Sequence, residues 1–249
     1  MPSKKNNTTV IAVCIQEPTE DGSKMDLGAI QGDNLRFLHQ AFITDTLMNA
    51  FRVPSVDVRL YYIDEPERAR LVKIVTDYVT NKAGGRKRDG LKDRFSVQGM
   101  ARERWGLRME KIFQDCFEDG YHNVLLVGSR TPTFTASMMN TALRMLQQSD
   151  AVFGPTPEGR YYTIGMSGSY HISLSDFDWK SPSIYSQVAS AFTDQNLSWS
   201  ELEIWYAVES TEELDLMVRD INQYRFEEDD TTTRETELVM ERLIAKLDT

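Results

Sequence analysis

The sequence has few of the residues on which several classes of protein depend. It holds 2 cysteines, Cys14 and Cys116, in 249 residues, which cannot form the disulfide framework of a secreted chain. Both lie within apolar patterns, so we expect buried thiols in a reducing compartment. The 3 histidines show no spacing typical of metal ligands, and no metal site is expected from them.

Long hydrophobic runs are scarce as well. The apolar run that follows the polar N-terminus covers only residues 10–15 (VIAVCI), and no small-residue cleavage site comes after it. Such a run is too short for a signal peptide or for a membrane span. We therefore expect a cytoplasmic protein with no membrane partner.

Positive charge is outweighed by negative charge. The chain has 28 Lys and Arg against 38 Asp and Glu, a net charge of −10, and residues 225–249 are especially acidic. A nucleic-acid partner is not expected, because the phosphate backbone attracts clustered cations. Residues 82–94 (KAGGRKRDGLKDR) are a basic exception, for which we favour a solvated loop over a phosphate or partner patch.

What is present fits a globular α/β protein. Hydrophobic residues make up 41% of the chain, and its length suits one large domain or two small ones. Apolar runs predict strands, and 3.6-residue periodicity predicts helices. The predicted strands are residues 10–15, 56–63, 124–127, 150–154, 160–166 and 204–208. The predicted helices are residues 33–50, 66–80, 105–117, 135–148, 181–193, 211–223 and 234–247.

Helix caps refine these boundaries. Asp33 or Asn34 is expected to cap the first helix, and Ser181 with the proline after it to begin another. Ser210 and Glu213 form the pattern of a capping box. The last helix has leucines on one side, which we expect to pack on its own domain; docking of a partner is the alternative.

Loops that follow strands are the places to seek a site, because ligands of open α/β sheets bind beyond the carboxyl ends of the strands. The loops at 16–33, 128–134 and 154–160 qualify. Gly22 and Lys24 in the first could present amides and a cation to a phosphate, or form an ordinary turn, and they do not match the Walker pattern. Elsewhere, the Asp-x-Asp at 176–178 could hold a cation, but a solvated turn is favoured.

Five segments carry a resemblance by their order and spacing. They are residues 18–27 (PTEDGSKMDL), 42–47 (FITDTL), 126–132 (LVGSRTP), 154–165 (GPTPEGRYYTIG) and 207–210 (AVES). Together they resemble the bacterial selenobiology-associated transferases, which are glycosyltransferase-A-like proteins of the nucleotide-diphospho-sugar transferase superfamily. The resemblance covers residues 8–225, and the Gly-Pro segment is its most specific part.

The resemblance implies a three-layer α/β/α sandwich with a Rossmann-like half and a mostly parallel central sheet. It implies one domain over residues 1–225, followed by an acidic linker and an amphipathic helix over 226–249. The implied ligand is a nucleotide or a sugar nucleotide. The residues expected to bind it are Gly22, Lys24, Gly128, Ser129, Arg130, Gly159 and Tyr161.

The departures from the family pattern fall on charged positions. Arg130 stands where the family has an acid that holds a divalent cation, and Asp26 stands where it has an arginine. The Asp-Gly-Gly turn of the family is residues 158–160 (EGR) here, and Ala207 replaces an aspartate. A cation at position 130 repels a metal ion, so metal-assisted stabilisation of a leaving diphosphate is lost there.

Three functions are compatible with this pattern. We favour a transferase-like protein that binds a nucleotide or sugar nucleotide and has altered or lost activity, a pseudoenzyme. The first alternative is an active metal-independent transferase, in which Arg130 replaces the metal, aided by Lys24 and Arg160, and Glu158 acts as the general base. The second is a non-enzymatic interaction protein.

Overall fold

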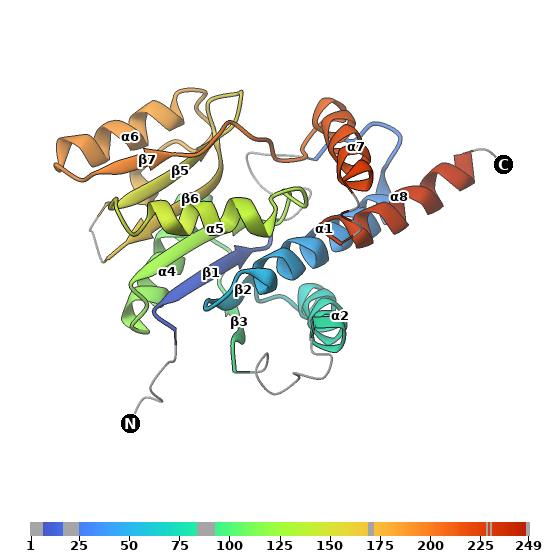
Figure 1. The fold of residues 1–249 in the computed structure, drawn as a ribbon, viewed down its shortest axis with the longest axis horizontal. Coiled ribbons are helices and arrows are strands. Elements are labelled where there is room, and N and C mark those ends of the chain that lie inside the picture. Colours follow the sequence, from blue (N-terminus) through green and yellow to red (C-terminus); the bar gives the residue numbers. More distant parts are fainter. Residues whose placement is uncertain are drawn as a thin grey trace.

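A central sheet with helices on both faces organises the chain (Figure 1). The computed structural model describes residues 7–16, 25–83, 93–168, 172–227, 229 and 231–247. The sheet order is β3-β2-β1-β4-β6-β5-β7, and β6 alone runs antiparallel to its neighbours. The strands are β1 (Thr9–Cys14), β2 (Asp57–Ile63), β3 (Phe95–Met100), β4 (Asn123–Gly128), β5 (Ala151–Pro155), β6 (Tyr161–Ser167) and β7 (Trp199–Glu201).

The helices complete a three-layer α/β/α sandwich, which confirms the predicted fold class. Side chains of α1, α2 and α5 pack on one face of the sheet, and those of α4 and α6 pack on the other. The helices are α1 (Gly32–Arg52), α2 (Pro66–Ala83), α4 (Trp105–Glu118), α5 (Ala136–Met145), α6 (Ile184–Asp194), α7 (Thr211–Phe226) and α8 (Arg234–Leu247), with a short 3₁₀ helix η2 (Leu174–Asp176).

The continuous apolar run of β1 follows from its place in the middle of the sheet. Val10, Ala12 and Cys14 point into the core under α4 and α6, and the alternate residues Ile11 and Val13 point into the core under α1, α2 and α5. All five are fully buried. A strand covered on both faces needs apolar residues at every position, which the sequence provides.

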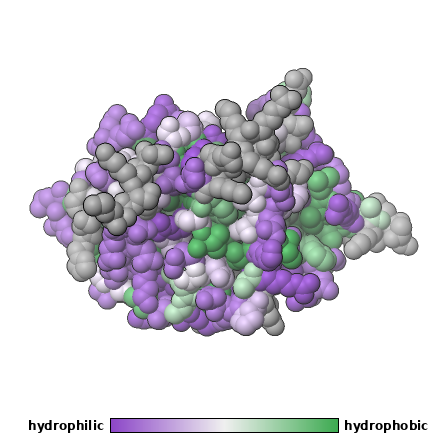
Figure 2. Space-filling model, turned by 90° about the horizontal axis from the view of Figure 1, so that it is seen from below, coloured by the Kyte–Doolittle hydropathy of each residue, from purple (hydrophilic) through white to green (hydrophobic). Residues whose placement is uncertain are grey.

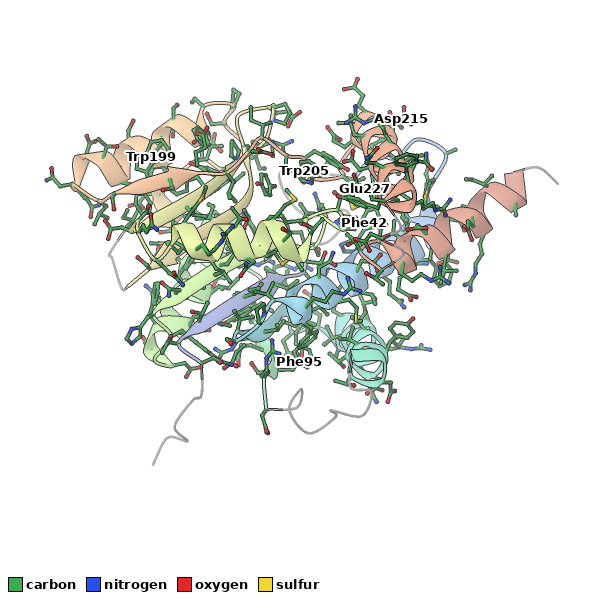
Figure 3. The ribbon with its side chains drawn as sticks, viewed as in Figure 1. Phe42, Phe95, Trp199, Trp205, Asp215 and Glu227 are labelled. Carbon is green, nitrogen blue, oxygen red and sulfur yellow. The ribbon has the colours of Figure 1, made fainter. Side chains whose placement is uncertain are left out.

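A smaller third core joins α7 and α8 to the N-terminal half of α1. Leu38 and Phe42 of α1 pack with Met217 of α7, and Val239 of α8 packs against the same cluster. Figure 3 shows Phe42 on α1, close to α7 and α8. The apolar side of α8 is therefore packed within its own chain, as favoured from the sequence, and Leu243 on that side is buried.

The predicted strands are confirmed with one exception. Residues 204–208 do not join the sheet: Ile204 is 62% exposed, and isolated hydrogen bonds take the place of a ladder, such as that from the Trp205 amide to the Pro155 carbonyl. The edge strand β3 was not predicted. It contains the polar residues Ser96 and Gln98 and is exposed or half-exposed along its length, so it lacks the apolar run of a buried strand. The short strand β7 takes the opposite edge.

The predicted helices are present, but two of their starts differ. Gln31 precedes α1 without a side-chain cap, and Asp33 instead pairs with Arg36 one turn later. α6 begins at Ile184, because the Ser181 hydroxyl accepts a hydrogen bond from the Ser183 amide in a turn before the helix. The remaining cap predictions hold at α7, where the capping box of Ser210 and Glu213 forms.

The surface agrees with the acidic composition. Figure 2 shows a face that is mostly hydrophilic, with hydrophobic residues gathered near its middle. In the described part of the chain, no helix combines the length and the apolar character that crossing a membrane requires. Most of the basic segment 82–94 lies outside the described residues, and its last residue, Arg94, hydrogen-bonds the carbonyls of Val53 and Val56.

Candidate functional site

A cavity of about 780 Å³ opens where the parallel strands end. Gln16, directly after β1, and Gly128, at the end of β4, lie on its wall. This is the edge of the sheet to which the arrow of β1 points in Figure 1. The other walls come from residues 102–106, 156–164, 175–180 and 207–209. The place agrees with the rule that α/β sheets bind ligands beyond their carboxyl ends.

Two arginines and one glutamate form an ion-pair network at this cavity. An Nη1 atom of Arg130 lies 3.0 Å from Oε1 of Glu209, and Nη1 of Arg160 lies 3.0 Å from Oε2 of the same carboxylate. The Arg130 side chain is fully buried, whereas 35% of the Arg160 side chain is exposed. Glu209 and Arg160 line the cavity, and Arg130 lies behind them. The network carries one net positive charge.

Backbone hydrogen bonds fix the segment that carries Glu209. The Val208 amide donates to the Arg130 carbonyl at 2.8 Å, and the Asp26 amide donates to the Glu209 carbonyl at 2.8 Å. The capping box of α7 begins at the next residue, Ser210. Asp26 itself is exposed and does not line the cavity, so its carboxylate lies away from the cavity wall.

The residues just after β4 lie under the floor of the cavity. The Ser129 hydroxyl accepts a hydrogen bond from the Gln16 amide at 2.9 Å and lies 3.1 Å from Nε2 of His39. Burial, and then the charge of Arg130, lower the pKa of His39 to about 3, so the imidazole is neutral. A Cβ atom at Gly128 would meet Oε1 of Gln16 at 2.4 Å, so a larger residue there would displace the end of the Gln16 side chain.

The turn between β5 and β6 needs a glycine at its tip. Gly159 has a φ of +75°, and a Cβ atom there would lie 2.5 Å from the Pro182 carbonyl oxygen. Glu158 and Tyr161, on either side of this turn, line the cavity, and Gly159 does not. The Tyr161 hydroxyl donates to the Tyr185 carbonyl at 2.8 Å.

The structure thus brings five of the predicted site residues to the cavity, three on its wall and two beside it. Gly128, Glu158 and Tyr161 lie on the cavity wall, and Ser129 and Arg130 are buried beside it. Gly22 and Lys24 lie outside the described residues. Ligand binding by any of these residues stays a prediction.

Two further segments of the wall were not predicted as parts of the site. Residues 102–106 precede and begin α4, and residues 175–180 follow η2; they bring Trp105, Phe177 and Trp179 to the cavity. Asp176 and Asp178 of the Asp-x-Asp pattern also line it. In the described residues, no group of three or more His, Cys, Asp or Glu side chains could hold a metal ion. The sequence signal that could have identified these two segments is the presence of aromatic residues between charged ones.

Comparison with solved structures supports the fold. A "putative nucleotide-diphospho-sugar transferase" from Desulfovibrio desulfuricans G20 superposes with a TM-score of 0.71 and 24% identity, over 95% of this chain and 98% of that one. The 4-diphosphocytidyl-2C-methyl-D-erythritol synthase of Anaerococcus prevotii DSM 20548 gives a TM-score of 0.54 at 10% identity, over 88% and 96% of the two chains. Among curated proteins, none matches this sequence.

A family model covers the middle of the chain. Residues 55–181, just over half of the sequence, match the family described as "Uncharacterized protein conserved in bacteria (DUF2064)". The match includes β4, the turn between β5 and β6, and the two unpredicted wall segments. Together with the similar structures, it confirms the resemblance found in the sequence. The chain belongs to the bacterial DUF2064 family.

Proposed function

We propose that the cavity binds a nucleoside diphosphate or a nucleotide sugar, and that fixed cations rather than a metal ion neutralise the diphosphate. The observation that carries this proposal is the network of Arg130, Glu209 and Arg160 at the carboxyl end of the sheet. The similar structures support the ligand class, since one is named for nucleotide-diphospho-sugar transfer.

The network supports neutralisation of the diphosphate without a metal. The carboxylate of Glu209 is shared by two guanidinium groups, so it has little charge left to attract a cation. Arg130 supplies a buried positive charge where the resembling family has an acid. Arg160 is partly exposed on the wall and can donate to a phosphate oxygen while Arg130 retains Glu209.

Binding in the absence of metal is the first test. Titration calorimetry with UDP, CDP, GDP and ADP in EDTA is expected to show binding of at least one of them. Arg160→Gln is expected to weaken that binding by roughly tenfold to a hundredfold, because a charge-assisted hydrogen bond contributes about 1.5–3 kcal/mol. Arg144→Gln is the matched control, since Arg144 is an exposed arginine of α5 away from the cavity. Binding that requires Mg²⁺ or Mn²⁺, or no binding of any nucleotide, would refute the proposal.

The loss of the metal-holding acid supports altered or lost transferase activity. One observation favours retained, metal-independent catalysis instead: Glu158 lies on the same wall as Arg160, and its carboxylate makes no ion pair with any residue that the structure describes. Such an acid is available as a general base. Turnover of a nucleotide sugar that survives EDTA and falls in Glu158→Gln, with diphosphate binding unchanged, would establish this alternative.

A further inference from the structure

Four aromatic side chains form one wall of the cavity, here called the aromatic wall: Trp105, Tyr161, Phe177 and Trp179. The ring centres of Tyr161 and Trp179 are 6.0 Å apart, and those of Phe177 and Trp179 are 6.3 Å apart with their planes nearly perpendicular. Behind Trp105, the buried guanidinium of Arg108 lies 5.2 Å from the ring centre. The rings thus support one another and hold defined orientations.

Two of the three polar ring atoms of the wall, those of Trp179 and Tyr161, are already engaged inside the protein. The Trp179 Nε1 donates to the Leu174 carbonyl at 2.7 Å, and the Tyr161 hydroxyl donates to the Tyr185 carbonyl. Gly106 lets Trp179 approach, since a Cβ atom at that position would lie 2.4 Å from Nε1. The aromatic wall therefore offers a ligand ring faces and few hydrogen-bonding groups.

Carboxylates with no ion pair lie on the same cavity. Asp176 and Asp178 flank Phe177, and Glu158 lies on the turn before Tyr161. In the part of the chain that the structure describes, none of the three makes an ion pair, and only the Asp178 carboxylate accepts a hydrogen bond, from the Lys180 amide at 3.1 Å.

Some other charges on the wall are paired: Arg102 pairs with Glu65, and Glu103 lies 3.4 Å from Lys111. Arg104 and Lys180 also line the cavity and make no ion pair with a described residue. The wall thus holds three unpaired carboxylates against two unpaired cations. Ionised carboxylates only accept hydrogen bonds, so a ligand that meets them must bring donors.

We propose that the aromatic wall and these carboxylates bind the acceptor of the transfer, a hydroxyl-rich molecule such as a sugar or polyol. Sugar rings have an apolar C–H face that packs on aromatic rings and a rim of hydroxyl groups that donate to carboxylates. The acceptor role rests on the proposed nucleotide function, whereas the binding of a hydroxylated ligand can be measured without it. A diphosphate is less favoured here, because the three unpaired carboxylates outnumber the two unpaired cations of the wall, and like charges repel.

Three of the four rings of the aromatic wall come from segments outside the expected nucleotide site, whereas Tyr161 is also among the residues expected to bind the nucleotide. The nucleotide is expected over the loop at 16–33 that follows β1, and the aromatic wall belongs mainly to residues 102–106 and 175–180, before α4 and after η2. A cavity of about 780 Å³ is at the upper part of the range for small-molecule sites, which leaves room for a second ligand beside a diphosphate.

Saturation-transfer NMR tests the proposal with methyl α-D-glucopyranoside, methyl α-D-mannopyranoside and glycerol as probes. At least one probe is expected to receive saturation from the wild-type protein. The effect should be strongest at the C–H protons of the probe that lie nearest the aromatic rings. Asp176→Asn is expected to lower the affinity for that probe by about tenfold, since the side chain keeps its shape but loses its charge. Trp179→Phe, which reduces the ring face, is expected to weaken it as well.

Matched controls exclude general effects of substitution. Asp215→Asn changes an exposed aspartate of α7, and Trp199→Phe changes a tryptophan of β7; neither residue lines the cavity, and Figure 3 shows both. Both variants are expected to bind the probes as the wild type does. A thermal unfolding midpoint for each variant identifies any change that acts through folding.

The outcomes separate this inference from the proposed function. Probe binding that is lost in Asp176→Asn while UDP, CDP, GDP and ADP all fail to bind supports the hydroxyl site and overturns the nucleotide proposal. Nucleotide binding with no saturation of any probe overturns the inference alone. Saturation of tetramethylammonium but of no probe would make the wall a cation site, and displacement of the probes by uridine or cytidine would make it a base site; either result overturns the inference.

Discussion

Replacement of Asp45 by asparagine tests how α8 is attached to the rest of the molecule. Asp45 lies on α1 and is 1% exposed. Its two carboxylate oxygens accept hydrogen bonds from the amides of Glu235 at 3.0 Å and Thr236 at 2.8 Å. These amides belong to the first turn of α8, where a helix leaves its N–H groups without partners. A side chain of one helix thus caps another, 190 residues further along the chain.

The pKa of Asp45 sets the size and sign of the effect. Burial raises this pKa from 3.8 to about 7, although the hydrogen bonds from Thr236 and Glu235 act in the opposite direction. The folded protein therefore holds the proton more tightly than the unfolded chain. The stability that this provides is complete below about pH 4 and is lost as the pH rises through 7. The difference between the two pKa values corresponds to about 4 kcal/mol of the free energy of unfolding.

Urea unfolding measured by tryptophan fluorescence between pH 5 and pH 8 compares the wild type with Asp45→Asn. Asparagine offers a single acceptor oxygen, so the variant leaves one amide of α8 unsatisfied, at a cost of about 1–3 kcal/mol in the free energy of unfolding. Because asparagine does not titrate, this cost does not depend on pH. The wild type is expected to lose stability relative to the variant as the pH rises. Asp215→Asn, on the exposed side of α7, should show no such trend. A constant difference between wild type and Asp45→Asn across this range would refute the reasoning.

Three smaller predictions follow from single positions. Gly159→Ala should lower the free energy of unfolding by about 1–3 kcal/mol, because of its positive φ and its approach to the Pro182 carbonyl, as a urea midpoint would show; an unchanged midpoint would contradict the geometry. Thr135→Ala should cost about 0.5–2 kcal/mol in the same assay, since the Thr135 hydroxyl caps α5 by accepting from the Met138 amide, and Thr135→Ser should restore most of it. The imidazole NMR signals of His39 should stay constant from pH 8 to pH 5, because its pKa of about 3 keeps it neutral; a midpoint near 6.5 would show that the ring is not buried as described.

The fold could be predicted from the sequence where burial is two-sided or where periodicity is strong. Residues 10–15 and 124–127 are apolar without interruption, since both strands lie inside the sandwich. The stripe from Trp105 to Phe117 identified α4. The edge strand β3 could not be found in this way, because half-exposed edge residues lack a pattern of their own.

The site could be predicted only in outline. The Gly-containing loops indicated the edge of the sheet at which the cavity opens, where Gly128 lies close to the Gln16 side chain. The burial of Arg130 was beyond sequence reasoning, since its partner Glu209 lies 79 residues away and a lone arginine after a strand is usually solvated. The segments around Trp105 and Trp179 meet only through the tertiary fold.

The shared carboxylate of Glu209 also restricts how this cavity can change by mutation. Its two arginines come from the loop after β4 and from the turn between β5 and β6, so three loops depend on one another's charge. Arg130→Asp alone would place a second carboxylate beside Glu209 where there is no exposed surface, and both would compete for Arg160. Conversion of this cavity into an acidic, metal-holding one would therefore need several substitutions together. Any one of them alone would lower the stability of the folded chain.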